Sequence, residues 1–310
     1  MPSWYRKLFI LSLIPFVLAL GAIAVWGLEP NIELAGGSLL QVGYEERPDI
    51  NIVETTVGSL NIGEVLVQPS GDSDYILRQR VLSVEEKDEL SDSLAALGTM
   101  EEKRYTSIGP SIGNELARKA WWAVGLVILS TILYITFAFR GVSVSEVDAP
   151  RKYLPSWKYG LVAIITLMHD VVVPIGLYAF MGFAYGSEVG TLFIVALLTI
   201  LGISINDTIV IFDRIRENLA LNESTKKHQS YETVVWNSIK QTLARSFNTS
   251  LTVIMMLVAL VFLGPESTKE LSITLTVGMI AGTYSSILLA APMLVFLEKR
   301  QRKTNVVKTS

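Results

Sequence analysis

The stretch G202-I-S-I-N-D-T-I-V-I-F-D-R-I-R-E-N218 closes a long apolar run that begins near Val189. Asp207 lies several residues inside this run, whereas Asp213 and Arg214 lie where it ends. The run predicts a transmembrane helix, in which a carboxyl group costs on the order of 2.5–3.5 kcal/mol to insert. Such a residue tends to face other helices or a water-filled path, so Asp207 is a candidate functional residue. The alternative is a neutral Asp207 that only hydrogen-bonds a neighbouring helix.

Composition indicates a membrane protein. Of the 310 residues 50% are hydrophobic, and the mean hydropathy is +0.44, values typical of a chain with several membrane-spanning helices. The absence of cysteine excludes disulfides and thiolate metal sites, and the two histidines, His169 and His228, leave little for a histidine-based metal site. We therefore expect no metal or cofactor. A net charge of −3 gives no basic footprint for nucleic acid.

Five further apolar runs accompany the one that holds Asp207. The first, residues 8–26, is interpreted as an uncleaved helix, with A-I-A at 22–24 as a competing signal-peptide cleavage site. The others cover residues 121–139, 159–183 and 271–297, and a run that reaches Leu263 after a possible interfacial helix at Tyr231–Leu243. The predicted divisions are residues 1–26, an outer domain at 27–119, helices two to six at 120–297, and a basic tail at 298–310.

The distribution of lysine and arginine predicts the orientation. These residues gather at the N-terminus, in the two longer loops between runs and in the tail, whereas the short loops and residues 27–119 are poor in them or rich in acid. Because positively charged loops remain in the cytoplasm, both termini are expected to be cytoplasmic and the acid-rich domain to lie across the membrane.

Residues 27–119 contain no apolar window long enough to span a bilayer. Alternating patterns predict strands at 38–45, 64–68, 75–81 and 103–108, and a helix at 50–59. Ser83, followed by Glu86, predicts a capped helix that continues to Ala96 and ends at Gly98. The order βαββαβ predicts an α+β ferredoxin-like domain.

A polar stripe enters the membrane on the fifth predicted helix. It begins at Arg245 and continues at helical spacing through Asn248, Thr249 and Thr252. An antiparallel neighbour would bring it to a depth near that of Asp207, which is flanked by Ser204, Asn206 and Thr208. An arginine beside an aspartate favours the ionised carboxylate, and separation allows protonation, so Asp207 and Arg245 are the predicted proton pathway. The alternative is an arginine that snorkels to the lipid headgroups.

Two other intramembrane patterns have structural interpretations. His169 and Asp170 lie near the middle of the third run, but neighbouring residues on a helix point about 100° apart. They are therefore not expected to bind one ion as a pair, although one of them can orient a neighbouring helix, and we favour a structural hydrogen-bonding role. Gly278 and Gly282 form a G-x-x-x-G pattern in the sixth run, which permits close helix packing.

No nucleophile–base arrangement, Walker A motif or dinucleotide fingerprint is present in the sequence. The chain is therefore predicted not to be an enzyme or an ATP-driven motor. If it performs work, the proton-motive force is the expected source, and one charge moved across 100 mV provides roughly 2.3 kcal/mol.

Five segments carry a resemblance to a known family. They are L-A-G-G-S-L-L-Q-V at 34–42, I-G-P-S-I-G-N-E-L-A-R-K-A at 108–120, H-D at 169–170, I-S-I-N-D-T-I-V-I-F-D-R-I-R-E-N at 203–218 and Q-T-L-A-R-S-F-N-T-S at 241–250. With them the chain resembles the SecF branch of the SecD/SecF protein-export membrane proteins over almost its whole length. It departs from the family at Ile203, where an aromatic residue is common, and at Leu34, which replaces phenylalanine.

The resemblance implies a six-helix relative of the resistance–nodulation–division transporters in the bacterial cytoplasmic membrane. It implies a complex with SecD that uses protons, or alternatively sodium ions, to draw exported unfolded polypeptides outward after SecA has pushed them through SecYEG. The family's proton-pathway aspartate and arginine match Asp207 and Arg245. Two alternatives stay open: a proton-coupled exporter of lipids or small molecules, and a non-transporting scaffold whose polar residues only join helices.

Overall fold

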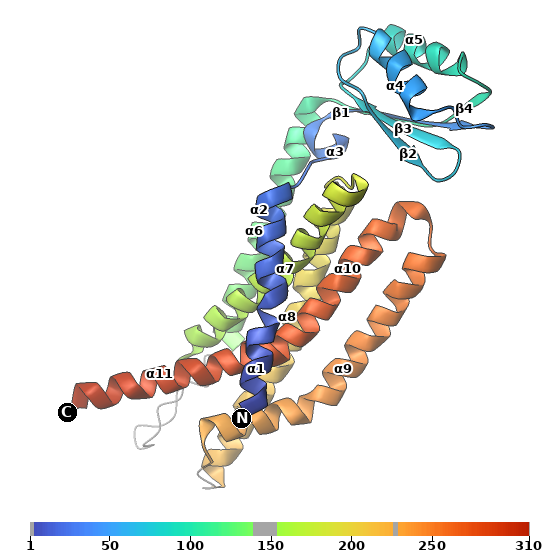
Figure 1. The fold of residues 1–310 in the computed structure, drawn as a ribbon. Helices are drawn as coiled ribbons and strands as arrows, with labels where there is room; N and C mark the ends of the chain where they lie inside the picture. The colour runs from blue at the N-terminus through green and yellow to red at the C-terminus, as the bar shows by residue number, and fades with distance from the viewer. Residues whose placement is uncertain (1–2, 139–153, 226–228, 310) are drawn as a thin grey trace. The chain divides into compact units, whose positions relative to one another are not determined.

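The computed structural model describes residues 3–138, 154–225 and 229–309 (Figure 1). The chain forms two compact units. The helical unit comprises Met1–Gly27, Val124–Phe183 and Leu192–Ser310, and the sheet unit comprises Leu28–Ala123 together with Ala184–Thr191. The short connection at 184–191, which the sequence presented only as a link between two membrane runs, therefore belongs to the sheet unit.

Within the described residues, six helical segments are long and apolar enough to cross a membrane, in agreement with the six predicted runs. Their elements are α1 (Ser3–Ser12) with α2 (Ile14–Trp26), α6 (Pro110–Ala138), α7 (Ser156–Tyr185), α8 (Thr191–Ser224), α9 (Tyr231–Leu263), and α10 (Glu266–Ser285) continued by η2 (Ser286–Ala290) and α11 (Ala291–Thr309). The chain is thus a multi-pass helical protein with a small antiparallel sheet.

Several helices extend beyond the apolar runs that predicted them. Helix α8 continues past Phe212 to Ser224, and its polar part contains the ion pairs Arg214–Glu217 at 2.5 Å and Arg216–Asp213 at 2.9 Å. Such pairs, three residues apart, support a solvated helix that hydropathy does not register. The predicted interfacial helix and the fifth run form the single helix α9, whose first turn is capped by Ser230.

The first and last spans are interrupted rather than straight. Helix α1 ends at Ser12 and α2 begins at Ile14, with Pro15 in its first turn. In the last span the π-helical turn η2 separates α10 from α11, and the Tyr5 hydroxyl donates a hydrogen bond to the Ile287 carbonyl of that turn. Helix α1 is therefore held against the interrupted turn of the last span.

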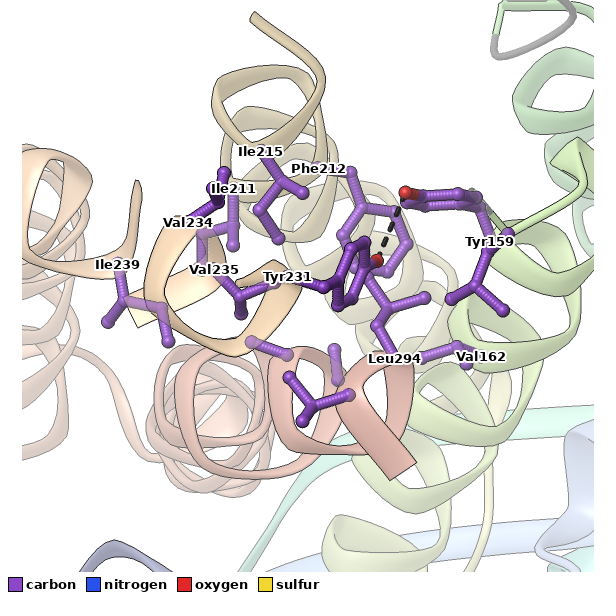
Figure 2. Packing of buried hydrophobic residues seen from close by; sticks show 14 of the residues in the cluster. Tyr159, Val162, Ile211, Phe212, Ile215, Tyr231, Val234, Val235, Ile239 and Leu294 are labelled. Carbon is purple, nitrogen blue, oxygen red and sulfur yellow. Dashed lines mark hydrogen bonds between the residues drawn. The ribbon is translucent and has the colours of Figure 1, made fainter. Parts of the chain in front are cut away.

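A buried cluster joins α7, α8, α9 and α11 at the end of the helical unit where α8 meets α9 (Figures 1 and 2). In Figure 2 the hydroxyls of Tyr159 and Tyr231 face each other at 3.1 Å, and the Tyr159 ring packs edge-on against Phe212 with centroids 5.5 Å apart. Aromatic pairs of this kind contribute about 0.5–1.5 kcal/mol beyond their buried area. The cluster packs these four helices together.

The sheet unit has the element order expected from the sequence, β-α-β-β-α-β. Its elements are β1 (Gly37–Tyr44), α4 (Ile50–Ser59), β2 (Leu66–Ser70), β3 (Asp74–Gln79), α5 (Val84–Ala95) and β4 (Met100–Ile108), preceded by the short α3 (Ile32–Ala35). The sheet is antiparallel with strand order β2-β3-β1-β4, and Leu40 of β1 lies opposite Leu77 of β3. Residues of α4 and α5 complete its core, among them Val53, Val57, Leu90 and Leu94.

Helix α5 begins with the predicted capping box. The Glu86 amide donates to the Ser83 hydroxyl at 3.2 Å, and the Ser83 amide donates to the Glu86 carboxylate at 2.8 Å. Hydrogen bonds from the Arg80 side chain, and then from the Ser83 amide, lower the pKa of Glu86 to about 2. Glu86 therefore stays ionised and keeps the cap intact at neutral pH.

The connection between α7 and α8 is attached to the sheet unit by several contacts. The Val189 amide donates to the Glu29 carbonyl at 2.7 Å, and the Asn31 amide donates to the Val189 carbonyl at 2.9 Å. Glu188 forms an ion pair with Arg78 of β3 at 2.7 Å. Helices α7 and α8 are therefore joined by a segment that is part of the sheet unit.

Candidate intramembrane polar site

Asp207 lies in the interior of the helical unit, on the middle of α8. Its side chain is 5% exposed, and the Ser250 hydroxyl of α9 donates to its Oδ2 atom at 3.3 Å. That distance is long for a hydrogen bond between a hydroxyl and a carboxylate. The carboxyl is thus buried with one weak partner from the neighbouring helix.

A cavity of about 140 Å³ borders Asp207. Its walls come from α8, α9 and α10 and include Ile200, Ser204, Asp207, Leu257, Gly278 and Gly282. A Cβ atom placed on Gly278 would lie 2.2 Å from Ile200 Cδ1, and one placed on Gly282 would lie 3.0 Å from Ser204 Cβ. The G-x-x-x-G pattern of α10 therefore lies directly against α8, one turn from Asp207.

Ser204 also connects this cavity to His169 and Asp170 of α7. Its hydroxyl donates to Asp170 Oδ2, and the other carboxyl oxygen of Asp170 lies 2.9 Å from His169 Nδ1. Both residues of the pair are buried, with Asp170 at 0% and His169 at 2% exposure. The two neighbouring side chains therefore turn toward each other despite the helical offset, and both are held in hydrogen bonds.

The far side of His169 contacts two groups that the sequence analysis missed. The Nε2 atom lies 3.1 Å from the Ser12 carbonyl of α1 and 3.1 Å from the Tyr284 hydroxyl of α10. The ring also stacks on Phe16 of α2 with centroids 5.7 Å apart. Pro15 was a visible sign of a helix interruption near Ser12, but nothing in the sequence linked that interruption to His169.

The predicted stripe on α9 has a different environment. Arg245, Asn248 and Thr249 are exposed on the surface of the helical unit, and Thr249 bonds only the Arg245 carbonyl, at 2.9 Å. Among the described residues no hydrogen bond or ion pair joins Arg245 to Asp207. Asn206 of α8 is exposed as well. The structure thus brings His169, Asp170, Ser204 and Asp207 together in the interior. In contrast, Asn206, Arg245, Asn248 and Thr249 lie on the surface.

Two hydroxyls near the Asp207–Ser250 contact are buried without a hydrogen-bond partner among the described residues. They are Thr208 Oγ1 on α8 and Ser246 Oγ on α9, neighbours in sequence or one helical turn from the bonded pair. Buried polar atoms of this kind are uncommon and are often satisfied by water. No group of three histidine, aspartate or glutamate side chains suited to a metal ion occurs in the part of the chain that the structure describes.

Comparison with known proteins identifies the family. The family described as "Protein export membrane protein SecD/SecF, C-terminal" matches residues 89–147 and 153–300. The chain belongs to the SecD/SecF family. The match includes all four residues of the gathered polar site, so that site lies within the part of the chain that defines the family.

Relatives within the SecD/SecF family match nearly the full chain. A protein translocase subunit SecF from Thermobaculum terrenum is 35% identical over 96% of this chain and 93% of its own length. Another, from Anaerolinea thermophila, is 36% identical over 94% and 91%. The crystal structure of SecDF from Thermus thermophilus superimposes with a TM-score of 0.80 at 29% identity, over 95% of this chain and 38% of that longer chain. A second SecDF structure gives a TM-score of 0.67 at 29% identity.

Proposed function

We propose that this chain is the SecF subunit of a Sec protein translocase, which acts with a SecD partner to promote late steps of polypeptide export. The relatives named SecF cover both chains almost completely, which supports the same role here. The SecDF structures combine a similar fold with a longer chain, which supports SecD as the partner that supplies the rest.

The proton-motive force is the proposed energy source, and the observation that carries this proposal is Asp207. A carboxyl that is 5% exposed inside a membrane span, beside a cavity, costs free energy to bury. Residues of this kind mark ion and proton pathways. Among the described residues only Ser250 donates a hydrogen bond to it, at a long distance, which leaves it able to exchange a proton. Arg245 of the neighbouring helix, whose charge acts on the Asp207 carboxyl, is proposed as the partner charge.

The placement of the two units follows from the distribution of charge. The sheet unit, with its βαββαβ order, is proposed as a ferredoxin-like domain outside the cytoplasmic membrane, centred on residues 27–119, with both termini in the cytoplasm. Exported polypeptides delivered through SecYEG by SecA would meet the complex on that outer side. The subunit is proposed to work by a change of packing driven by protonation, without catalysing a covalent reaction.

The test measures late-stage export of a precursor into inverted membrane vesicles that contain the chain, SecD and SecYEG. Asp207→Asn should assemble normally and lose the part of export that depends on an imposed proton gradient. The matched control is Asp213→Asn on the same helix, whose carboxylate is exposed beyond the apolar part of the helix and pairs with Arg216. Full gradient dependence in the Asp207 variant would refute proton carriage by Asp207, and dependence on a sodium gradient instead would identify the other ion.

A further inference from the structure

The protonation of the His169–Asp170 pair is constrained by its hydrogen-bond partners. The Ser12 carbonyl can only accept, so its contact with His169 Nε2 requires a proton on that nitrogen. The contact between His169 Nδ1 and Asp170 Oδ1 also requires one proton between the two atoms. With both protons present the pair is neutral overall, whether it is written as imidazolium and carboxylate or as imidazole and carboxylic acid.

The two ring nitrogens also have partners in a state with one proton fewer, although the Ser12 carbonyl then loses its donor. If Nε2 loses its proton, the Tyr284 hydroxyl at 3.1 Å can donate to the vacated lone pair, while Nδ1–H still donates to Asp170. The Ser204 hydroxyl donates to Asp170 Oδ2 in either state. A purely structural histidine needs partners for one state, whereas His169 has partners for two.

The pair also lies between two cavities. On one side, Ser204 and Asp207 share the 140 Å³ cavity, which is large enough for water. On the other side, His169 lines a cavity of about 740 Å³ whose walls are mostly apolar, such as Phe16 and Leu289, and also include Glu232 and Lys299. Glu232 and Lys299 form an ion pair at 2.5 Å, and the Lys299 side chain is 57% exposed. The larger cavity therefore reaches from the buried imidazole to the end of the helical unit where the chain begins.

We propose that His169 and Asp170 form a second proton-exchange site, which passes protons between the Asp207 cavity and the larger cavity. This inference rests on the proposed proton coupling at Asp207. A proton that enters from the Asp207 side binds the Ser204 hydroxyl as that hydroxyl gives its own proton to Asp170. Asp170 passes a proton to His169 Nδ1, and Nε2 releases one toward the larger cavity, so no net charge accumulates.

The groups that face the pair come from four elements. They are the Ser12 carbonyl of α1, the Phe16 ring of α2, Ser204 of α8 with Asp207 beyond it, and the Tyr284 hydroxyl of α10; Tyr5, Glu232 and Lys299 lie across the larger cavity. Tyr284 and Asp207 are therefore the titratable side chains whose substitution can change the protonation of the His169–Asp170 pair.

The direct test is nitrogen NMR of the imidazole in bilayers that contain the chain and SecD. The sequence has two histidines, so His228→Gln leaves His169 as the single labelled ring. A proton-exchange site should change from two ring N–H groups to Nδ1–H alone as the pH is raised from about 5 to about 9. One fixed protonation state across that range would overturn the inference.

Tyr284→Phe sharpens the same measurement because it keeps the ring against His169 and removes the hydroxyl. The form with a lone pair on Nε2 should lose population at each pH, since its donor is gone. Tyr134→Phe, at an exposed position on α6, is the matched control and should leave the spectra unchanged. Equal spectra for Tyr284→Phe and the unsubstituted ring would show that Tyr284 does not serve the second state.

The vesicle assay separates this inference from the function on which it rests. His169→Gln should assemble with SecD and retain export without a gradient, while its gradient-dependent export falls to the level seen with Asp207→Asn. If Asp207→Asn loses gradient dependence and His169→Gln keeps it, the second site is wrong and the proposed function stands. If both variants keep it, the proposed function fails first.

Discussion

Helices α7 and α8 keep their polar side chains inside the helical unit, whereas α9 presents its polar stripe outward. Over their most apolar windows 56% of α7 and 44% of α8 are buried, compared with 17% of α9. On the first two, His169, Asp170 and Ser204 bond one another. On α9, Arg245 and Asn248 are exposed within a membrane span. The polar residues of α7 and α8 are thus enclosed by the chain itself, whereas the polar stripe of α9 needs cover from another protein.

The difference follows from what each helix face costs in a bilayer. A charged side chain that faces lipid is unfavourable, and it is tolerated where other helices or water cover it. The exposed face of α9 also carries the large side chains Met255 and Met256. A face that combines an arginine with such anchors is suited to contact with partner helices, which is why we assign it to SecD. The enclosed network needs no such cover.

The largest predicted effect on the stability of this chain comes from a larger side chain at Gly176, where α7 packs closely against α2. A Cβ atom on Gly176 of α7 would lie 2.3 Å from the Cα atom of Ala19 in α2. Gly176→Val should therefore lower the free energy of unfolding in detergent by about 1–3 kcal/mol or more, as overpacking does. Gly202→Val on α8, where no atom lies within 4 Å, is the control and should have little effect. Equal losses would mean that α2 does not pack as described.

A smaller effect is expected at the unpartnered hydroxyl of Thr208. Removing a buried hydroxyl that has no partner among the described residues should leave the free energy of unfolding unchanged or raise it by up to about 1 kcal/mol. Thr208→Val provides this change at nearly constant volume. Thr166→Val is the control, because the Thr166 hydroxyl bonds the Val162 carbonyl at 2.9 Å. Destabilisation by Thr208→Val, measured by chemical unfolding, would show that the hydroxyl holds a bound water.

The smallest effect on the isolated chain is expected at Arg245. Arg245→Leu should change its free energy of unfolding by less than about 0.5 kcal/mol, since surface substitutions seldom do more. Co-purification with SecD and gradient-dependent export should both decrease. Met256→Leu, three turns away on the same exposed face but without a charge, should affect both less. A strongly destabilised Arg245→Leu chain would place the arginine in the enclosed network and remove the contrast between α9 and its neighbours.

Local sequence signals were sufficient for the elements of both units. Hydropathy predicted six spans because each apolar run must cover a bilayer, and α4 was predicted at Ile50–Ser59, where it lies. The capping box at Ser83 and Glu86 was predicted because its two hydrogen bonds connect residues three apart. Helix ends were less accurate: α6 begins at Pro110 and α8 ends at Ser224, because polar helical turns continue beyond the apolar part.

The sequence by itself determined that Asp207 lies inside a membrane span, because the charge of one residue and the length of one run decide that. Only the tertiary structure decided what surrounds the intramembrane polar residues. The Ser204–Asp170 bond joins residues 34 apart, and the contact between His169 and the Ser12 carbonyl joins residues 157 apart. No periodicity extends over such separations. These contacts depend on how α1, α7, α8 and α10 pack. Small residues such as Gly176 and Gly282 permit close packing because they leave room for residues that are distant in the sequence.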